Sequence, residues 1–500
     1  MAKIMMVSSE AHPFAKTGGL ADVVGALPFA LQAFGDEAAV VMPRYRSIDR
    51  EDAELVREDM RVWLNGGFYS VNVYLKVHRG VKFYFIDCHG LFDRDGIYGD
   101  RAGDFGDNAL RFAVLCLAAL GVARFLFRTD IFHCHDWQAA LLPLYRKFYF
   151  PNDRTFVGTK SLFSIHNLAY QGYFPRRQLE EIGLDDRFWN AGALEFHGGG
   201  NLMKAGLLWS DALSTVSPTY AREIQTAEFG CGMEGILQSR STQWAGILNG
   251  VDYEDWSPET DRFIAAPYSV KDMAGKMACK RDLLEYFGFP LDDLHLKRPI
   301  VGVVSRLAEQ KGLDLVGEMI VPILDEELTL IVLGSGDRKL EDMFNHFSWT
   351  RPDKFRSWIG HNNPLAHRVE AGSDMFLMPS RYEPCGLNQM YSLRYGTLPI
   401  VHATGGLEDT VDGETGFKFW GAYGPHLLEA VRHAVAVYWN DPDRWGQMVR
   451  TAMGRDYSWN ASASAYSGLY RALLRNPEPE AESFPAPPAS ERIGHHRVGR

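Results

Sequence analysis

The sequence is short of several features that mark particular classes of protein. Its six cysteines form no CxxC pair and no framework spacing, so we expect reduced thiols rather than disulfides. It has no excess of positive charge, because 52 Lys and Arg face 63 Asp and Glu for a formal net charge of -11. That balance argues against nucleic acid or an anionic membrane as a partner. It also lacks the ~18 uninterrupted apolar residues of a membrane span and a signal or transit sequence, so we expect a cytoplasmic protein.

The chain does contain a regular alternation of short apolar runs and helical patterns, which is typical of parallel α/β units. Its length of 500 residues exceeds what one core normally supports. We therefore predict an α/β fold with two doubly wound, Rossmann-like domains that face a cleft, where open α/β sheets bind ligands. The predicted strands are KIMMVS, AAVVMP, KFYFID, DIFHCH and SLFSIH in the first half, and PIVGVVS, LTLIVLG, KFRSWIG, DMFLMP and LPIVHA in the second.

The pattern is interrupted in ILNGVDYEDWSPETD, residues 247–261, by an Asn-Gly pair, a proline and several acids. Such a segment favours a domain boundary. We predict an N-terminal domain over 1–250, a C-terminal domain over 251–455 and a terminal helix over 456–475. The remaining residues, 476–500, are rich in Pro, Glu, Ala and Ser, a composition typical of a disordered tail.

The tetrapeptide TGGL occurs twice, in KTGGLADVV and in ATGGLEDTV. Each copy follows a predicted strand and opens a helix. Paired glycines let backbone amides approach an anion closely, with the positive end of the helix dipole behind them. We expect Gly18 and Gly19 in the first loop, and Gly405 and Gly406 in the second, to face one cleft.

Two cations lie on one loop of the second half. SRLAEQKGLD places Arg306 just after a predicted strand and Lys311 just before a helix. They suit a diphosphate, because Arg offers a planar fork and Lys a point charge. The alternative is an ordinary solvated loop, which the position at a strand's carboxyl end makes less attractive.

A further loop, PSRYEPCGLNQ, also follows a predicted strand. Glu383 could accept hydrogen bonds from sugar hydroxyls. The amides of Cys385, Gly386 and Leu387 would point outward at a helix N-terminus, where anions and hydroxyls can be held. Cys385 has no basic partner beside it, so we interpret it as an unreactive, partly buried thiol rather than a nucleophile.

In the first half, FHCHDWQAAL puts His133 and His135 on one face of a strand, with Asp136 and Trp137 at its end. Two His and an Asp suggest a metal, but neither HExxH nor the spacing of a third ligand accompanies them. We predict no metal site. Asp136 is better interpreted as a polar group aimed into the cleft, and Trp137 as a residue that either packs or stacks on a sugar.

SIHNLAYQGYFP repeats this arrangement. His166 and Asn167 stand at a strand terminus, with Tyr170 close behind. A lone histidine is usually structural. Because this one ends a third strand that converges on the same cleft, we favour a functional role for it.

Taken together, these segments resemble the bacterial glycogen synthases of the starch and glycogen synthase family, which uses ADP-glucose. The matching motifs extend from Lys3 to about Leu474 in the family's order. They are KTGGLADVVGALP, HDWQAAL, HNLAYQG, KAGLLWSDALSTVSPTYAREI, LNGVD, VSRLAEQKGLDL and PSRYEPCGLNQMYSLRYGTLPIV.

The resemblance implies a GT-B glycosyltransferase that adds glucose from ADP-glucose to the non-reducing end of an α-1,4-glucan such as glycogen, with retention at the anomeric carbon and no cofactor or metal. It also implies that the terminal helix crosses back to the first domain. Three alternatives stay open: the same fold with UDP-glucose or another acceptor, a catalytically silent glucan-binding paralogue, and a glucan phosphorylase with pyridoxal phosphate, for which we find no lysine context.

The resemblance further implies roles for residues in both domains. His361 stands where the family commonly has a Tyr taken to stack on adenine. Closure of the domains would be needed to bring Lys16 opposite Arg306 and Lys311. The implied catalytic residues are Asp136, His166, Arg306, Lys311 and Glu383. The implied donor-binding residues are Lys16, Gly18, Gly19, Arg306, Lys311, His361, Cys385, Gly386, Leu387, Thr404, Gly405 and Gly406, and those on the acceptor side are Trp137, Asn167, Tyr170 and Asn249.

Overall fold

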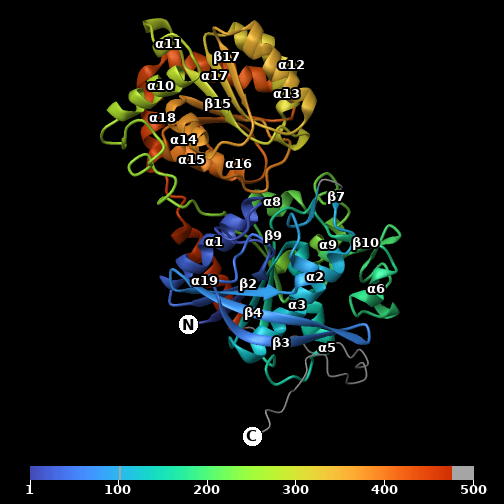
Figure 1. The fold of residues 1–500 in the computed structure, drawn as a ribbon. Coiled ribbons are helices and arrows are strands. Elements are labelled where there is room, and N and C mark those ends of the chain that lie inside the picture. Colours follow the sequence, from blue (N-terminus) through green and yellow to red (C-terminus); the bar gives the residue numbers. More distant parts are fainter. Residues whose placement is uncertain (101–102, 476–500) are drawn as a thin grey trace. The chain divides into compact units, whose positions relative to one another are not determined.

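A computed structural model describes residues 1–100 and 103–475 (Figure 1). The chain divides into two compact units, and the main boundary falls between Gly250 and Val251. The predicted tail, 476–500, lies outside the described residues. Unit 1 contains Met1–Val216, Ala221–Gly250 and the terminal helix α19 (Trp459–Arg475), and unit 2 contains Ser217–Tyr220 and Val251–Ser458.

Unit 1 is built on a nine-stranded sheet of order β14-β13-β9-β8-β1-β2-β5-β4-β3. Pairing is parallel from β14 to β5 and antiparallel from β5 to β3. Strand order reverses direction between β1 and β8, the point at which such sheets bind ligands. The strands are β1 (Lys3–Val7), β2 (Glu37–Pro43), β3 (Glu54–Leu64), β4 (Gly67–His78), β5 (Val81–Asp87), β8 (Ile131–His135), β9 (Lys160–Ile165), β13 (Ala212–Thr215) and β14 (Trp244–Gly246).

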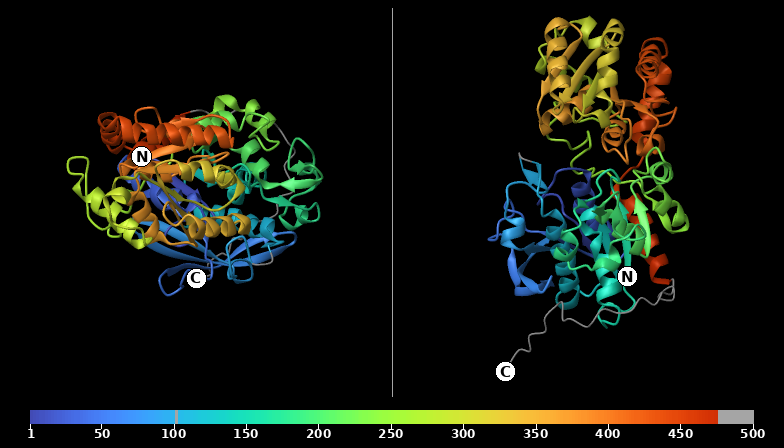
Figure 2. Two further views of the ribbon diagram at one scale, coloured as in Figure 1. Left: turned by 90° about the horizontal axis from the view of Figure 1, so that it is seen from above. Right: turned by 90° about the vertical axis from the view of Figure 1, so that its right-hand side faces the viewer.

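Helices pack on this sheet in two groups. α5 contacts both α3 and α7, and α1 contacts both β2 and α19. Helix α19 lies along unit 1 in the right-hand view of Figure 2. Among the described residues, α3 alone has the length and composition to cross a membrane, and 78% of that stretch is buried inside the protein. The helices are α1 (Gly19–Gln32), α2 (His89–Phe92), α3 (Asn108–Phe125), α4 (Asp136–Ala139), α5 (Leu141–Tyr149), α6 (Gln178–Glu181), α7 (Leu202–Trp209), α8 (Pro218–Glu223), α9 (Glu234–Ser239), η1 (Asp186–Phe188) and η2 (Ser241–Gln243).

Two small sheets complete unit 1. They lie in the connections between the longer elements. Their strands are β6 (Gly99–Asp100) and β7 (Gly103–Asp104), and β10 (Tyr173–Phe174), β12 (Gly199–Asn201) and β11 (Glu195–Phe196).

Unit 2 is built on a six-stranded parallel sheet of order β17-β16-β15-β18-β19-β20. Strand order reverses direction between β15 and β18, as it does between β1 and β8 in unit 1. The strands are β15 (Ile300–Val304), β16 (Thr329–Gly334), β17 (Phe355–Ile359), β18 (Met375–Met378), β19 (Leu398–His402) and β20 (Phe417–Phe419).

Strand residues of unit 2 alternate between two hydrophobic cores. Leu330 and Val332 of β16 join a cluster with residues of α12 and α17, whereas Ile331 and Leu333 join a cluster with residues of α10 and α14. Helices therefore cover both faces, and the strands read as continuous apolar runs. The helices are α10 (Ala274–Tyr286), α11 (Asp293–Lys297), η3 (Glu309–Lys311), α12 (Leu313–Asp325), α13 (Arg338–Thr350), α14 (Asn363–Gly372), α15 (Asn388–Arg394), α16 (Gly405–Thr410), α17 (Gly424–Asn440) and α18 (Pro442–Gly454).

The predicted fold class is confirmed, and all ten predicted strands are present. One detail differs: the first TGGL segment does not follow β1 directly, because residues 8–18 separate that strand from α1. The antiparallel hairpin of β3 and β4 was not predicted. Its turn is Asn65-Gly66, both at positive φ, and this dipeptide is a strong hairpin signal that could have been used.

Candidate active site

A cavity of about 200 Å³ lies in unit 2 at the carboxyl ends of β15 and β18. It brings together five of the predicted residues from two loops. They are Arg306, Lys311, Glu383, Gly386 and Leu387, and the lining also includes Ser305, Ser380 and Asn388. His361 is exposed between β17 and α14 and is not part of this lining.

An ion pair joins the two loops. Lys311 Nζ lies 2.6 Å from Glu383 Oε2, and the Ser380 hydroxyl donates to the same carboxylate oxygen at 3.0 Å. The two charged side chains are only 20% and 8% exposed. A partly buried carboxylate with two donors has a fixed orientation, so this pair defines one wall of the cavity.

Gly312 explains why Lys311 can reach that position. Its φ is 65°, in the left-handed region that favours glycine, and a Cβ there would overlap the carbonyl oxygen of Pro379. Any other side chain would push η3 away from the loop after β18. The glycine of the SRLAEQKGLD segment is therefore needed because the backbone at Gly312 packs closely against Pro379.

Arg306 is exposed and is tethered within its own loop. Its guanidinium donates to Gln310 Oε1 at 3.1 Å, and the Gln310 carbonyl accepts from the amide of Arg381 at 2.9 Å. Gln310 thus ties Arg306 to the loop after β18, so both cations are anchored to the segment that carries Glu383. Two such cations can neutralise an anionic leaving group.

The second TGGL loop is packed against protein rather than open to a ligand. The amide of Gly406 donates to the carbonyl of Glu383 at 3.1 Å. A Cβ on Gly405 would overlap the Glu383 carbonyl oxygen, and one on Gly406 that of Cys385. Cys385 and Thr404 are 4% and 1% exposed. Gly405 and Gly406 therefore support the loop that carries Glu383 by packing against its backbone. The sequence did not suggest this role.

In unit 1, Asp136 and His166 meet at the ends of neighbouring strands β8 and β9. The amide of His166 donates to Asp136 Oδ1 at 2.7 Å. Burial raises the pKa of Asp136 to about 7, against the lowering effect of amide hydrogen bonds. Its φ of 55° is unusual for a residue with a side chain and indicates local strain. Asp136 can therefore change charge near neutral pH.

His166 is held by a second histidine. Its Nε2 lies 3.0 Å from His135 Nδ1, and burial lowers the pKa of His166 to about 3. The ring is neutral at physiological pH and can take part in hydrogen bonding without carrying charge. Both ring nitrogens of His133 are engaged, with Tyr470 at 2.8 Å and Ser164 at 2.6 Å.

The predicted acceptor-side residues differ in their surroundings. Trp137 packs edge-on against Phe112, with ring centroids 5.0 Å apart. Tyr170 is 54% exposed. Asn167 accepts the amide of Ala169 in a local turn. Asn249 is buried, and within the part of the chain that the structure describes its side-chain oxygen has no hydrogen-bond partner.

The first TGGL loop is open around its glycines, since a Cβ on Gly18 or Gly19 would meet nothing within 4 Å. Lys16 is exposed and pairs with Asp22 at 2.6 Å. The Gly18 amide donates to Glu10 at 3.3 Å. Sequence reasoning missed Glu10, although an acid in the loop after the first strand is a usable signal, and it also missed Ser380.

No group of three or more His, Cys, Asp or Glu suited to a metal ion occurs within residues 1–100 and 103–475. The chemistry available in unit 2 is a pair of cations beside a carboxylate, and in unit 1 a titratable carboxyl beside a neutral histidine. Two Rossmann-like units with such groups at the carboxyl ends of their strands have the architecture expected of a GT-B glycosyltransferase.

Comparisons with known proteins are specific about the family. Residues 3–239 match the starch synthase catalytic domain, and residues 298–436 match glycosyl transferases group 1. A glycogen synthase from Koribacter versatilis is 46% identical over 93% of this chain and 97% of its own length. One from Myxococcus xanthus is 46% identical over 94% and 99%. The chain belongs to the glycogen synthase family.

Solved structures agree on the fold. The catalytic domain of starch synthase IV from Arabidopsis thaliana, described as bound to ADP and acarbose, has a TM-score of 0.85 and 31% identity, covering 95% of this chain and all of that one. A sucrose-phosphate synthase from Thermosynechococcus elongatus has a TM-score of 0.59 at 17% identity, with 95% and 99% coverage. The latter likeness concerns the fold alone.

Proposed function

We propose that the protein transfers glucose from ADP-glucose to the non-reducing end of an α-1,4-glucan, with retention at the anomeric carbon. The observation that carries this proposal is the cavity in which Arg306 and Lys311 stand beside Glu383. We further propose that the reaction takes place in the cytoplasm and needs no metal or other cofactor, because these cations can neutralise a diphosphate themselves.

In the proposed reaction the bond between the glucose anomeric carbon and the donor phosphate oxygen breaks. A glucan hydroxyl attacks the same face, and its proton passes to the departing phosphate oxygen. The transition state resembles an oxocarbenium ion with a departing diphosphate. Lys311 and Arg306 stabilise the negative charge on that leaving group. Glu383, held by Lys311 and Ser380, orients the glucose by accepting hydrogen bonds from its hydroxyls.

We assign the groups of unit 1 to binding and orienting the sugars. Asp136 and His166 supply a carboxyl and a neutral imidazole held in one geometry. Tyr170 offers an exposed ring on which a sugar can stack.

The adenine preference rests on two supports. Starch synthase IV is described as bound to ADP, and His361 is exposed at the end of β17, where its imidazole can stack on a base. Because His361 stands where the family commonly has a Tyr, UDP-glucose is the competing donor.

Transfer of labelled glucose to glycogen from ADP-glucose and from UDP-glucose, in parallel and in the presence of a chelator, tests the proposal. Preferred transfer from ADP-glucose that survives the chelator supports both the donor and the metal-free reaction. Loss of transfer in chelator, restored by a divalent metal, overturns the metal-free part. Preference for UDP-glucose overturns the donor assignment, and no transfer from either overturns the reaction.

A further inference from the structure

Glu10 has no part in the proposed reaction, yet its carboxylate collects hydrogen bonds from two distant segments. It lies three residues after the end of β1 and is 2% exposed. The Thr17 hydroxyl donates to Glu10 Oε1 at 2.7 Å, and the amides of Thr17 and Gly18 both donate to Oε2. The Tyr98 hydroxyl donates to Oε1 as well. Four donors therefore converge on one buried carboxylate.

The buried Glu10 carboxylate needs these hydrogen bonds, and the loop that contains Thr17 and Gly18 needs the carboxylate. Among the described residues, Glu10 forms no salt bridge, so its buried charge is compensated by hydrogen bonds alone. Burying a carboxylate is costly unless it is well hydrogen-bonded. In return, the amides of Thr17 and Gly18, which precede α1 and have no helical partners, are satisfied. Losing the carboxylate would leave the backbone beside Lys16 without this support.

Tyr98 orients the carboxylate from the other side. Its hydroxyl also lies 2.7 Å from the Ser9 hydroxyl, and burial and the Glu10 charge raise its pKa well above the usual range. The phenol therefore stays protonated and remains a donor. The Tyr98 carbonyl accepts the Phe105 amide at 2.9 Å and the Asn108 side chain at 2.8 Å, which fixes the backbone that carries the ring.

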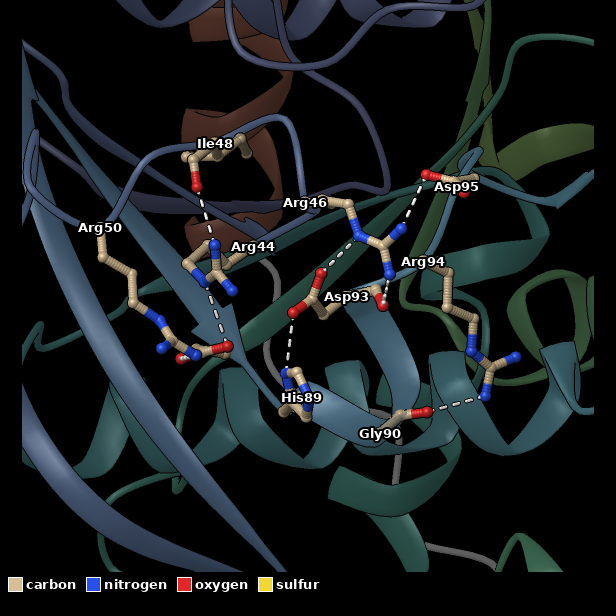
Figure 3. Close-up of polar contacts among 10 residues, drawn as sticks. Arg44, Arg46, Ile48, Arg50, His89, Gly90, Asp93, Arg94 and Asp95 are labelled. Carbon is tan, nitrogen blue, oxygen red and sulfur yellow. Dashed lines mark hydrogen bonds and ion pairs between the residues drawn. The ribbon is translucent and has the colours of Figure 1, made fainter.

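The segment before Tyr98 is fastened by arginines (Figure 3). Arg46 donates to the carboxylates of Asp93 and Asp95, each at 2.8 Å, and to the Asp93 carbonyl at 2.9 Å. Arg111 donates to the Ile97 carbonyl at 2.9 Å. These contacts hold the backbone before Tyr98 in place, and they therefore fix the position from which the Tyr98 hydroxyl donates to Glu10.

We propose that Glu10 is a positioning residue: its carboxylate, oriented by Tyr98, fixes the backbone of Thr17 and Gly18 so that Lys16 and the open N-terminus of α1 are presented in one geometry. The inference deepens the proposed function and rests on it in one respect, because Lys16 is expected to contact the donor diphosphate. Glu10 itself touches no substrate in this proposal.

Hydrogen–deuterium exchange on the full chain without substrate tests the loop directly. In Glu10→Gln, which keeps the size and removes the charge, the amides of Thr17 and Gly18 should exchange at least about tenfold faster, while the rest of unit 1 is unchanged. Glu37→Gln is the matched control, because it removes a carboxylate of β2 that pairs with Lys3 and Lys82 and leaves the loop untouched.

Tyr98→Phe provides a milder variant should Glu10→Gln fail to fold. It removes one of the four donors and keeps the ring, so a smaller acceleration at the same two amides is expected. Unchanged exchange in the folded variants overturns the proposal. Faster exchange throughout unit 1 also overturns it, because Glu10 would then serve general stability.

Kinetics link the loop to the reaction. Glu10→Gln should raise the KM for the nucleotide sugar or lower kcat about tenfold and leave the KM for glycogen unchanged, whereas Glu10→Asp should restore part of the loss. An equal change in both KM values overturns positioning. If the wild-type chain transfers glucose from neither donor, the proposed function fails, and the exchange measurement still decides the role of Glu10.

Discussion

The two TGGL loops share four residues and differ in what holds them. In the first, Gly18 and Gly19 have open space around them, and the backbone amides turn to the carboxylate of Glu10. In the second, Gly405 and Gly406 lie against the backbone of Glu383 and Cys385, where no Cβ fits. Glycine is thus used for an open approach in one loop and for tight packing in the other.

The difference shows why a repeated motif does not imply a repeated role. The first loop presents Lys16, an exposed cation paired with Asp22, and depends on a side chain for its shape. The second loop presents no charge of its own. It fixes the backbone of Glu383, whose side chain pairs with Lys311. The first loop is open to its surroundings, and the second supports the residue that we propose to orient the glucose.

The largest expected effect separates the two uses of glycine. In Gly406→Ala the new Cβ meets the backbone of Cys385, which cannot move aside as a side chain could. We expect a loss of about 4 kcal/mol or more in the free energy of unfolding of unit 2. Gly19→Ala, in open space at the start of α1, should change the free energy of unfolding by less than about 0.5 kcal/mol. Chemical denaturation of both variants checks this, and similar losses would contradict the distinction.

The second prediction compares the lysines associated with the two loops. Lys311→Ala should lower kcat about 100- to 1,000-fold, since it removes a partly buried cation and leaves Glu383 without its partner. Lys16→Ala should lower kcat by about tenfold or less, because an exposed charge acts in a high dielectric. Glucose transfer measured for both, with the exposed Lys297→Ala as a control, tests the order. Equal losses of activity in Lys311→Ala and Lys16→Ala would show that the exposure of the lysine side chain does not determine its contribution to the reaction.

Much of this arrangement could be predicted from the sequence. The strands were found because parallel strands buried on both faces read as uninterrupted apolar runs, as in PIVGVVS of β15. Arg306, Lys311 and Glu383 were found because each follows such a run. The strands β3 and β4 were missed because charged residues interrupt their apolar runs, as in ELVREDMRVWL.

Contacts between distant segments could not be obtained this way. Lys311 and Glu383 are 72 residues apart, and Glu10 and Tyr98 are 88 residues apart. The sequence around each residue does not indicate which distant residue it contacts. The packing of Gly406 against Cys385 was equally hidden, because the sequence shows that a residue is glycine and not what occupies the space beside it. These pairings depend on strand order, which the tertiary fold decides.

The third prediction concerns the carboxylates that follow β8 and β18, the strands next to the central strand in each unit. Glu383 has a cation beside it, whereas burial raises the pKa of Asp136 from 3.8 to about 7. The folded state therefore holds the Asp136 proton more tightly than the unfolded chain does. Its contribution to stability is present below pH 4 and is lost as pH rises from about 4 to 7.

Asp136→Asn, which cannot ionise and can still accept the His166 amide, should remove this dependence. Between pH 5 and pH 7 the wild-type protein should lose about 2 kcal/mol of unfolding free energy relative to the variant. Urea denaturation at both pH values measures the difference. If the free energy of unfolding changes equally in the two proteins between pH 5 and pH 7, Asp136 is charged in the folded state over this range, as expected for a carboxylate paired with a cation.

The smallest effect is expected at Cys385, which touches the second loop through its backbone. If the contact with Gly406 depends on the Cys385 carbonyl and not on the thiol, Cys385→Ser and Cys385→Ala should both keep kcat within about threefold of wild type. The serine variant should lose about 1 kcal/mol of stability, because it buries a hydroxyl in place of a thiol that is 4% exposed. Complete loss of transfer in both variants, with thermal unfolding intact, would give the thiol a chemical role. The second loop would then support a reactive thiol, and not only the backbone turn that orients Glu383.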